Sequence, residues 1–334
     1  MAYLLQPLKV GTLSLANRLV MPPMATAKAD AAGKVSPAML EYYAEKSAGG
    51  HISLIIVEHS FIAPEGKAGE NQLSIADDDV IEGLRELADI IHRSGSKAVL
   101  QINHAGSAAV AEITGTTPVG PSAVVNPRKG GTPREMTRQE IAGIVDAFRD
   151  AACRVKEAGF DGVEIHSAHG YLLNQFFSPL TNRRTDEYGG GVLNRIRIHL
   201  QVIAAVRAVV GEAFPLLLRL GAQDYVEGGT MAADSEIAAR EFAKAGVNIL
   251  DISGGFSGYS IPGVTEQGYF ATLAEAVKKV VSVPVIFTGG IIDVQVAERL
   301  LAEGKADLIG VGRAVLADSQ WAQKALESLR GQGD

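Results

Sequence analysis

The most constraining feature of the sequence is an alternation of short apolar runs with longer amphipathic stretches, which begins near residue 17 and repeats eight times. Most of the short runs are apolar without interruption, as expected of parallel strands that are covered on both faces. They cover residues 18–21, 53–58, 98–103, 162–166, 216–220, 249–252, 283–287 and 308–311. We therefore expect an α/β fold with a mostly parallel sheet.

Helical patterns separate the predicted strands. They cover residues 37–48, 79–94, 137–158, 192–210, 234–245, 270–281 and 294–302, and an eighth begins at Ala314. A glycine, the residue that most often ends a helix, follows several of them: Gly95, Gly159, Gly246 and Gly304. Eight strand–helix units, several of them with a glycine that ends the helix, favour a closed (β/α)8 TIM barrel over an open doubly wound sheet.

The segments outside the repeat refine this prediction. Residues 4–15, with a turn at 10–12, predict a β-hairpin that plugs the N-terminal end of the barrel. The loops after strands 3 and 4 are long, at about 104–136 and 168–191, and lie at the end where such barrels carry their chemistry. Because no Ser/Gly-rich linker divides the chain, we expect one domain over residues 1–334.

Charge and cysteine content exclude several classes of protein. Lys and Arg number 31 against 38 Asp and Glu, and no dense basic run is present, which argues against a nucleic-acid partner. The sequence has no signal-peptide pattern and no apolar span of ~20 residues, so we expect a cytoplasmic protein with no membrane partner. Cys153 is the only cysteine, which excludes a disulfide or a cysteine-ligated cluster within one chain, and its helical setting predicts that it is buried.

The end of strand 4 carries the most reactive set of side chains. His166, His169 and Tyr171 follow one another there, so two imidazoles and a phenol are expected at the mouth of the barrel. Imidazole N–H groups can polarise a carbonyl, and a phenol of pKa about 10 can deliver a proton. Two other readings stay open: the histidines could simply cap the strand, or they could bind a metal together with Glu164.

Glycines follow strands 7 and 8. Gly289 and Gly290 come after strand 7, and Gly312 and Arg313 come after strand 8. These are the two positions where (β/α)8 barrels bind phosphate through bare backbone N–H groups. The pattern predicts a phosphate site, and the alternative is two ordinary turns.

Three further features indicate a polar ligand inside the barrel. Arg219 lies within an otherwise apolar strand, so its guanidinium needs an electron-rich partner. Gln101 can both donate and accept hydrogen bonds. The rigid turn at residues 22–26 leaves backbone groups free to meet a ligand.

The stretch EIHSAHGYLLNQFFSPLTNRRTDEYGG, residues 164–190, resembles the Old Yellow Enzyme family. It is closest to the bacterial subgroup with a His-x-x-His-x-Tyr site. The resemblance extends over nearly the whole chain, from Asn17 to Arg313.

The resemblance implies an FMN-dependent ene-reductase, in which NADH or NADPH reduces a noncovalent FMN and the flavin N5 then passes hydride to a carbonyl-conjugated alkene, in a ping-pong cycle. It implies flavin-ring contacts from Pro23, Met24, Ala25, Gln101 and Arg219, and phosphate contacts from Gly289, Gly290, Gly312 and Arg313. It implies that His166 and His169 bind the substrate carbonyl oxygen and that Tyr171 donates the proton. No metal is implied.

Two positions depart from the family pattern. Ala25 stands where the subgroup usually has a cysteine that tunes the flavin, and Ser107 stands where an arginine is common. The effect of Ala25 on the flavin potential is therefore open.

Two other kinds of function remain as alternatives. One is a flavin-binding NADH oxidase or redox sensor, and the other is a TIM-barrel phosphosugar lyase or isomerase that binds no flavin. The sequence leaves open the physiological alkene, the choice between NADH and NADPH, and the subunit count, with a homo-oligomer among the options.

Overall fold

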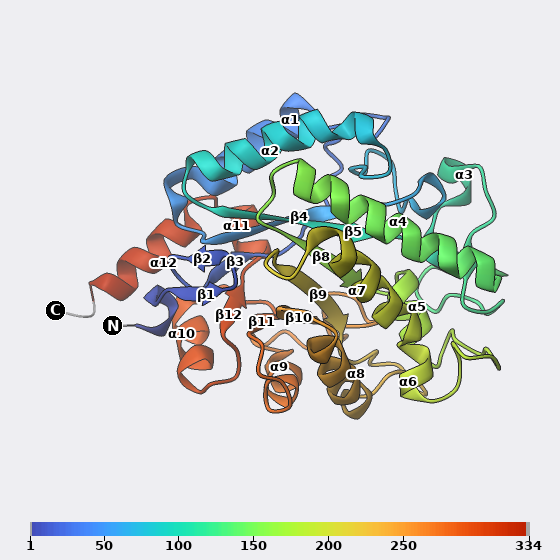
Figure 1. The fold of residues 1–334 in the computed structure, drawn as a ribbon. Helices are drawn as coiled ribbons and strands as arrows, with labels where there is room; N and C mark the ends of the chain where they lie inside the picture. The colour runs from blue at the N-terminus through green and yellow to red at the C-terminus, as the bar shows by residue number, and fades with distance from the viewer. Residues whose placement is uncertain (1, 332–334) are drawn as a thin grey trace.

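The computed structural model describes residues 2–331 and contains a closed barrel of eight parallel strands, ordered β3-β4-β5-β8-β9-β10-β11-β12 and back to β3 (Figure 1). The strands are β3 (Leu19–Met21), β4 (Leu54–Phe61), β5 (Lys97–Asn103), β8 (Gly162–Ser167), β9 (Leu216–Gly221), β10 (Ile249–Ser253), β11 (Val285–Thr288) and β12 (Leu308–Gly310). The predicted (β/α)8 barrel is confirmed, and every predicted strand overlaps an observed one. Residues 1 and 332–334, which the predicted domain also includes, lie outside the described residues.

Helices surround the barrel (Figure 1). The longer ones are α1 (Pro37–Ser47), α2 (Ile81–Arg93), α4 (Arg138–Glu157), α7 (Arg197–Val210), α8 (Ala232–Lys244), α9 (Ala271–Lys278), α10 (Val294–Ala302) and α12 (Trp321–Arg330). The shorter ones are α3 (Ala111–Thr114), α5 (Leu172–Phe177), α6 (Val192–Arg195) and α11 (Arg313–Ala317). The helix predicted over 192–210 is two helices, because Ile196 turns out of helical geometry at ψ 0°. No helix among residues 2–331 combines the length and the apolar character that crossing a membrane requires.

Helix α4 shows how the sequence fixes one of these elements. Thr137 accepts a hydrogen bond from the Glu140 amide, and the Glu140 carboxylate accepts one from the Thr137 amide, which closes a capping box at the first turn. The helix buries a stripe that includes Ala152 and Val155. Cys153 is exposed, so the prediction that it is buried was wrong. One residue turns a helix by about 100°, which takes Cys153 off the stripe to which Ala152 belongs.

The N-terminal end of the barrel is filled by an antiparallel hairpin of β1 (Leu8–Val10) and β2 (Leu13–Leu15). Leu13 and Leu15 are buried in an apolar cluster with inward-facing strand residues such as Val20 and Ile56. Gly11 has a φ of +58°, a backbone conformation that favours glycine at the turn.

Side chains alternate along the strands, and this alternation gives the barrel two interior layers. Strands β5, β9 and β10 each place an apolar residue in the layer next to the N-terminal hairpin and a polar residue two positions further along, in the layer next to the cavity. The apolar residues are Val99, Leu217 and Ile249, and the polar residues are Gln101, Arg219 and Asp251. The barrel is therefore sealed by hydrocarbon near the hairpin and is polar toward the carboxyl ends of its strands.

Long segments follow β5 and β8 at this polar end. The first contains a 3-10 turn (Gly106–Ala108), α3 and the short paired strands β6 (Val119–Gly120) and β7 (Arg134–Glu135), and the second contains α5.

Candidate active site

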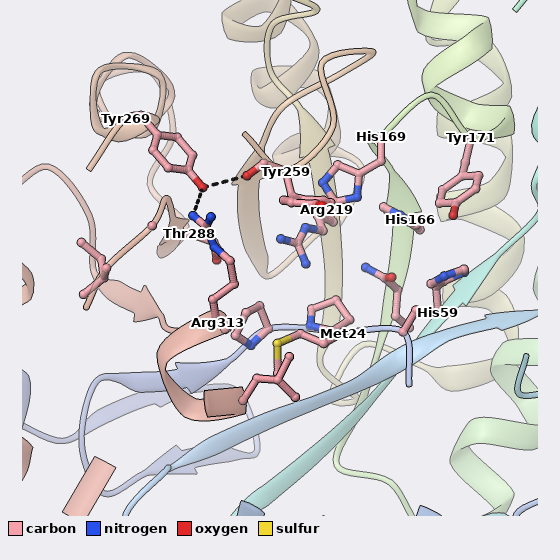
Figure 2. Close-up of a pocket in the computed structure, with 18 of the residues that line it drawn as sticks. Met24, His59, His166, His169, Tyr171, Arg219, Tyr259, Tyr269, Thr288 and Arg313 are labelled. Carbon is pink, nitrogen blue, oxygen red and sulfur yellow. Dashed lines mark hydrogen bonds between the residues drawn. The ribbon is translucent and has the colours of Figure 1, made fainter. Parts of the chain in front are cut away.

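A cavity of about 410 Å³ opens at the carboxyl end of the barrel (Figure 2). Eleven of the twelve predicted site residues line it: Pro23, Met24, Ala25, Gln101, His166, His169, Tyr171, Arg219, Gly290, Gly312 and Arg313. Gly289 lies behind the wall, where a Cβ would fall 2.6 Å from the Phe287 ring, so its place in the fold is explained by packing.

The floor of the cavity is a layer of buried polar side chains. Gln101 Nε2 donates a 2.7 Å hydrogen bond to Glu164, and Arg219 Nε lies 3.3 Å from an Asp251 oxygen without the geometry of a hydrogen bond. Burial raises the pKa of both carboxyl groups, and the Arg219 charge opposes that rise. Within residues 2–331, Arg219 Nε and Nη1 have no hydrogen-bond partner although they are buried. Buried donors of this kind need an acceptor, which the nitrogen and oxygen atoms of a flavin ring would supply.

One wall of the cavity has the properties of a phosphate site. Gly290 has a φ of +73°, and a Cβ there would lie 2.5 Å from the Tyr269 ring; a Cβ at Gly312 would lie 3.1 Å from Met24 Sδ. Arg313 donates a 2.9 Å hydrogen bond to the Tyr269 hydroxyl and makes no ion pair among the described residues. Bare backbone beside an unneutralised arginine fits the phosphate of FMN.

The two histidines and the tyrosine from the β8 end form the opposite wall. The rings of His166 and His169 are 5.1 Å apart between centroids, and those of His166 and Tyr171 are 5.2 Å apart. His169 has a φ of +60°, unusual for a residue with a side chain, and its Nε2 lies 2.8 Å from Ser253 Oγ. Burial lowers the pKa of both histidines well below the ordinary value, so both are neutral at pH 7.

Neutral imidazoles with a phenol beside them can hold an oxygen by hydrogen bonding without adding a full charge. Burial raises the Tyr171 pKa, which keeps its hydroxyl protonated, and the Arg128 charge acts in the opposite direction. Among residues 2–331, no three His, Cys, Asp or Glu side chains are grouped so that they could hold a metal ion.

The structure adds two residues that the sequence did not predict. His59 lines the cavity because β4 continues three residues beyond the predicted end at Glu58. Arg128 reaches the cavity from the long loop after β5 and donates a 3.0 Å hydrogen bond to the His169 carbonyl. The arginine missing at Ser107 therefore has a counterpart in the same loop, although no sequence pattern predicts how far a loop side chain extends.

The barrel and its site define a class, the (β/α)8 oxidoreductases that hold a phosphate-bearing flavin at the carboxyl ends of their strands. The model of the NADH:flavin oxidoreductase / NADH oxidase family matches residues 3–332, and the chain belongs to this family. Family membership implies FMN and a nicotinamide reductant, and it confirms the resemblance to Old Yellow Enzyme.

Three known proteins illustrate the match. The NADH oxidase of Thermoanaerobacter brockii is 43% identical over 97% of this chain, which spans about half (50%) of that protein's length. The NADPH dehydrogenase of Clostridium acetobutylicum is 39% identical over 92% of this chain and 89% of its own. The solved structure of the Old Yellow Enzyme homologue from Zymomonas mobilis is 26% identical, with a TM-score of 0.86 and coverage of 97% of this chain and 92% of that one.

Proposed function

We propose that this protein is an FMN-dependent ene-reductase that transfers hydride from NADH or NADPH, through flavin N5, to an alkene conjugated with a carbonyl group. The observation that carries the proposal is the meeting of two neutral imidazoles and a phenol in one cavity with the unpaired donors of Arg219. A single FMN-binding domain, a cytoplasmic location and a small-molecule alkene as substrate belong to the same proposal.

In this proposal the floor and one wall of the cavity hold the cofactor. Gln101 and Arg219 would contact the flavin ring, together with the backbone of Pro23, Met24 and Ala25. Arg313 and the backbone of Gly290 and Gly312 would hold the phosphate, with Gly289 supporting the turn. When bound, FMN supplies hydride chemistry between the nicotinamide and the alkene.

His166 and His169 hold and polarise the substrate. Each donates an N–H to the carbonyl oxygen, which draws electron density from the conjugated alkene and prepares its β-carbon to accept hydride. Because burial keeps both rings neutral, the oxygen is held by hydrogen bonds as its negative charge develops.

Tyr171 completes the reduction by protonating the α-carbon. Its hydroxyl O–H bond breaks, a C–H bond forms on the substrate, and the bonding electron pair stays on the phenolate oxygen. The phenolate then recovers a proton from solvent. Nicotinamide and alkene would use the same cavity in turn, as the proposed ping-pong cycle requires.

The test separates this proposal from its alternatives. Purified protein is expected to absorb near 450 nm, to bleach with NADH or NADPH without oxygen, and to regain its colour when mixed anaerobically with 2-cyclohexen-1-one or N-ethylmaleimide. Recovery with oxygen alone would indicate an oxidase or redox sensor instead. A colourless protein that takes up no added FMN would instead favour a phosphosugar lyase or isomerase.

A further inference from the structure

His59 is a third imidazole of the cavity, and the mechanism above does not use it. It comes from β4, whereas His166 and Tyr171 come from the end of β8. Its ring centroid lies 5.2 Å from that of Tyr171, with the planes tilted by 35°, and 6.1 Å from that of His166. Figure 2 shows the Tyr171 hydroxyl at the end of the ring that faces His59.

A chain of hydrogen bonds fixes which nitrogen of His59 carries the proton. The Ala68 amide donates to Gln72 Oε1 at 2.7 Å, which sets the orientation of the Gln72 amide group. Gln72 Nε2 therefore faces His59, where it donates to the His59 carbonyl at 3.0 Å and lies 2.9 Å from His59 Nδ1. An amide nitrogen can only donate, so Nδ1 must accept. Asn103 Nδ2, at 3.3 Å, also faces Nδ1.

The His59 ring is consequently locked with its proton on Nε2. Burial lowers the His59 pKa to about 4, and the Arg219 charge adds to this effect, so the ring carries one proton at pH 7. Within residues 2–331, Nε2 has no hydrogen-bond partner and is not among the enclosed polar atoms. It is an oriented donor with no partner, and the hydroxyl of the neighbouring Tyr171 ring likewise makes no hydrogen bond to the described residues, His59 included.

We propose that His59 is a positioning residue whose Nε2–H donates a hydrogen bond to the Tyr171 oxygen and stabilises the phenolate formed when Tyr171 protonates the substrate. His59 keeps its own proton throughout, because a neutral imidazole N–H is a much weaker acid than a phenol. The inference rests on the proposed function, since it needs Tyr171 as the proton donor.

The other charged or titratable groups around the pair act on it differently. They are His166 and His169 from the β8 end, Arg219 from β9 and Arg128 from the loop after β5. The Arg128 charge favours a phenolate at Tyr171 through space, and the Arg219 charge acts on His59. In the proposal, His59 acts on the phenolate oxygen directly through its N–H. Removing His59 should therefore affect proton transfer even though Arg128 remains.

The test is a double-mutant cycle on the FMN-loaded protein with His59→Leu, Tyr171→Phe and the double variant. Reduction by NADPH and reoxidation by 2-cyclohexen-1-one are measured separately by stopped flow, in H2O and in D2O. His59→Leu should slow reoxidation roughly tenfold, as expected for the loss of a hydrogen bond to a charged group, and should raise its solvent isotope effect. Reduction by NADPH should be unchanged.

In the Tyr171→Phe background, adding His59→Leu should change the reoxidation rate less than about twofold, because the group on which His59 acts is gone. A full further loss in that background would overturn the proposal and place His59 against the substrate itself. A fall in the isotope effect would also overturn it, because a misplaced substrate slows hydride transfer instead of proton transfer.

Two more variants serve as controls, one that restores the donor and one that replaces His59→Leu if that variant does not fold. His59→Gln restores an N–H donor and should recover most of the reoxidation rate. If His59→Leu does not fold, Gln72→Leu keeps the imidazole but removes the nearer of the two donors that face Nδ1, and an unchanged isotope effect there would count against the proposal. Failure of the wild-type protein to reduce any alkene would refute the proposed function, whereas reduction that His59→Leu leaves unaltered refutes only this inference.

Discussion

The two ends of the barrel are built from the same strands but have opposite chemistry. At the N-terminal end, Leu13 and Leu15 of the hairpin close a cluster of buried apolar side chains. At the carboxyl end, Arg219 has unpaired buried donors and His169 has a φ of +60°. Groups of the second kind reduce stability, and their concentration at the carboxyl end indicates that stability there has been exchanged for binding.

The largest effect should come from the carboxyl end and should be on catalysis alone. Tyr171→Phe removes the proton donor, so alkene reduction should slow roughly 100-fold or more, in the range of general acid catalysis. The free energy of unfolding should stay within about 0.5 kcal/mol, since the hydroxyl makes no hydrogen bond to the described residues. Stopped-flow measurement of the two half-reactions checks this, and an equal loss in flavin reduction by NADPH would show that Tyr171 has another role.

The next effect should come from the N-terminal end and should be on stability alone. Leu13 is 1% exposed, and Leu13→Ala should cost about 2–4 kcal/mol of unfolding free energy through lost burial and an unfilled cavity. Denaturant unfolding measures this cost, with Leu13→Met as the milder control. Activity per folded, FMN-loaded molecule should be unchanged, and a matching loss of activity would contradict the separation of the two ends.

A smaller effect is expected on cofactor affinity. Arg313→Gln removes the unneutralised charge beside Gly290 and Gly312, and FMN should bind about tenfold more weakly or worse. Quenching of free flavin fluorescence during titration of the apoprotein gives the dissociation constant. Arg299→Gln on α10, an exposed residue, is the control, and equal weakening there would indicate only a general effect of charge.

The smallest effect concerns pH. Glu58 is buried beneath the loop after β3 and accepts a hydrogen bond from the Thr26 amide; burial raises its pKa to about 7. A carboxyl that holds its proton more tightly when folded supports the fold at low pH and loses that support as pH rises toward 7.

Glu58→Gln keeps an acceptor for Thr26 and cannot ionise. Its melting temperature should match that of the wild type at pH 5 and exceed it by a few degrees at pH 8. The exposed Glu65 is the control, since Glu65→Gln should show no such divergence. Parallel melting curves at both values of pH would mean that Glu58 does not titrate in this range.

The periodicity of the sequence predicted the strands and the residues that directly follow them. It did not predict which side chains enter the cavity from the extended end of a strand or from a long loop. The strands are apolar runs whose length and spacing indicate strands and not helices. His166, His169 and Tyr171 directly follow strand 4, so their proximity could be predicted. His59 was missed because β4 was predicted to end one residue before it. Arg128 extends from a loop whose path depends on distant contacts such as the His169 carbonyl.

Packing and local turns also lay beyond the sequence pattern. The phosphate contact of Gly289 stays a prediction, and the Phe287 ring explains why no side chain fits at this position. The helix break at Ile196 falls within a continuous amphipathic pattern. Cys153 lies outside the buried stripe of α4 because it is one residue beyond Ala152. Each of these three features depends on the positions of particular neighbouring residues, which the periodicity of the sequence does not reveal.

The seam between β3 and β12 joins the first and last strands of the barrel, and Gly312 there sits so close to Met24 that a methyl group would lie 3.1 Å from its sulfur. The proposed flavin site is thus assembled from segments that lie far apart in the sequence. During synthesis the histidine wall is made long before the phosphate wall, so a nascent chain is expected to retain FMN only after residues as far as Arg313 have been made and folded. Uptake of FMN would therefore report closure of this seam, and saturation with FMN would favour molecules whose seam is closed.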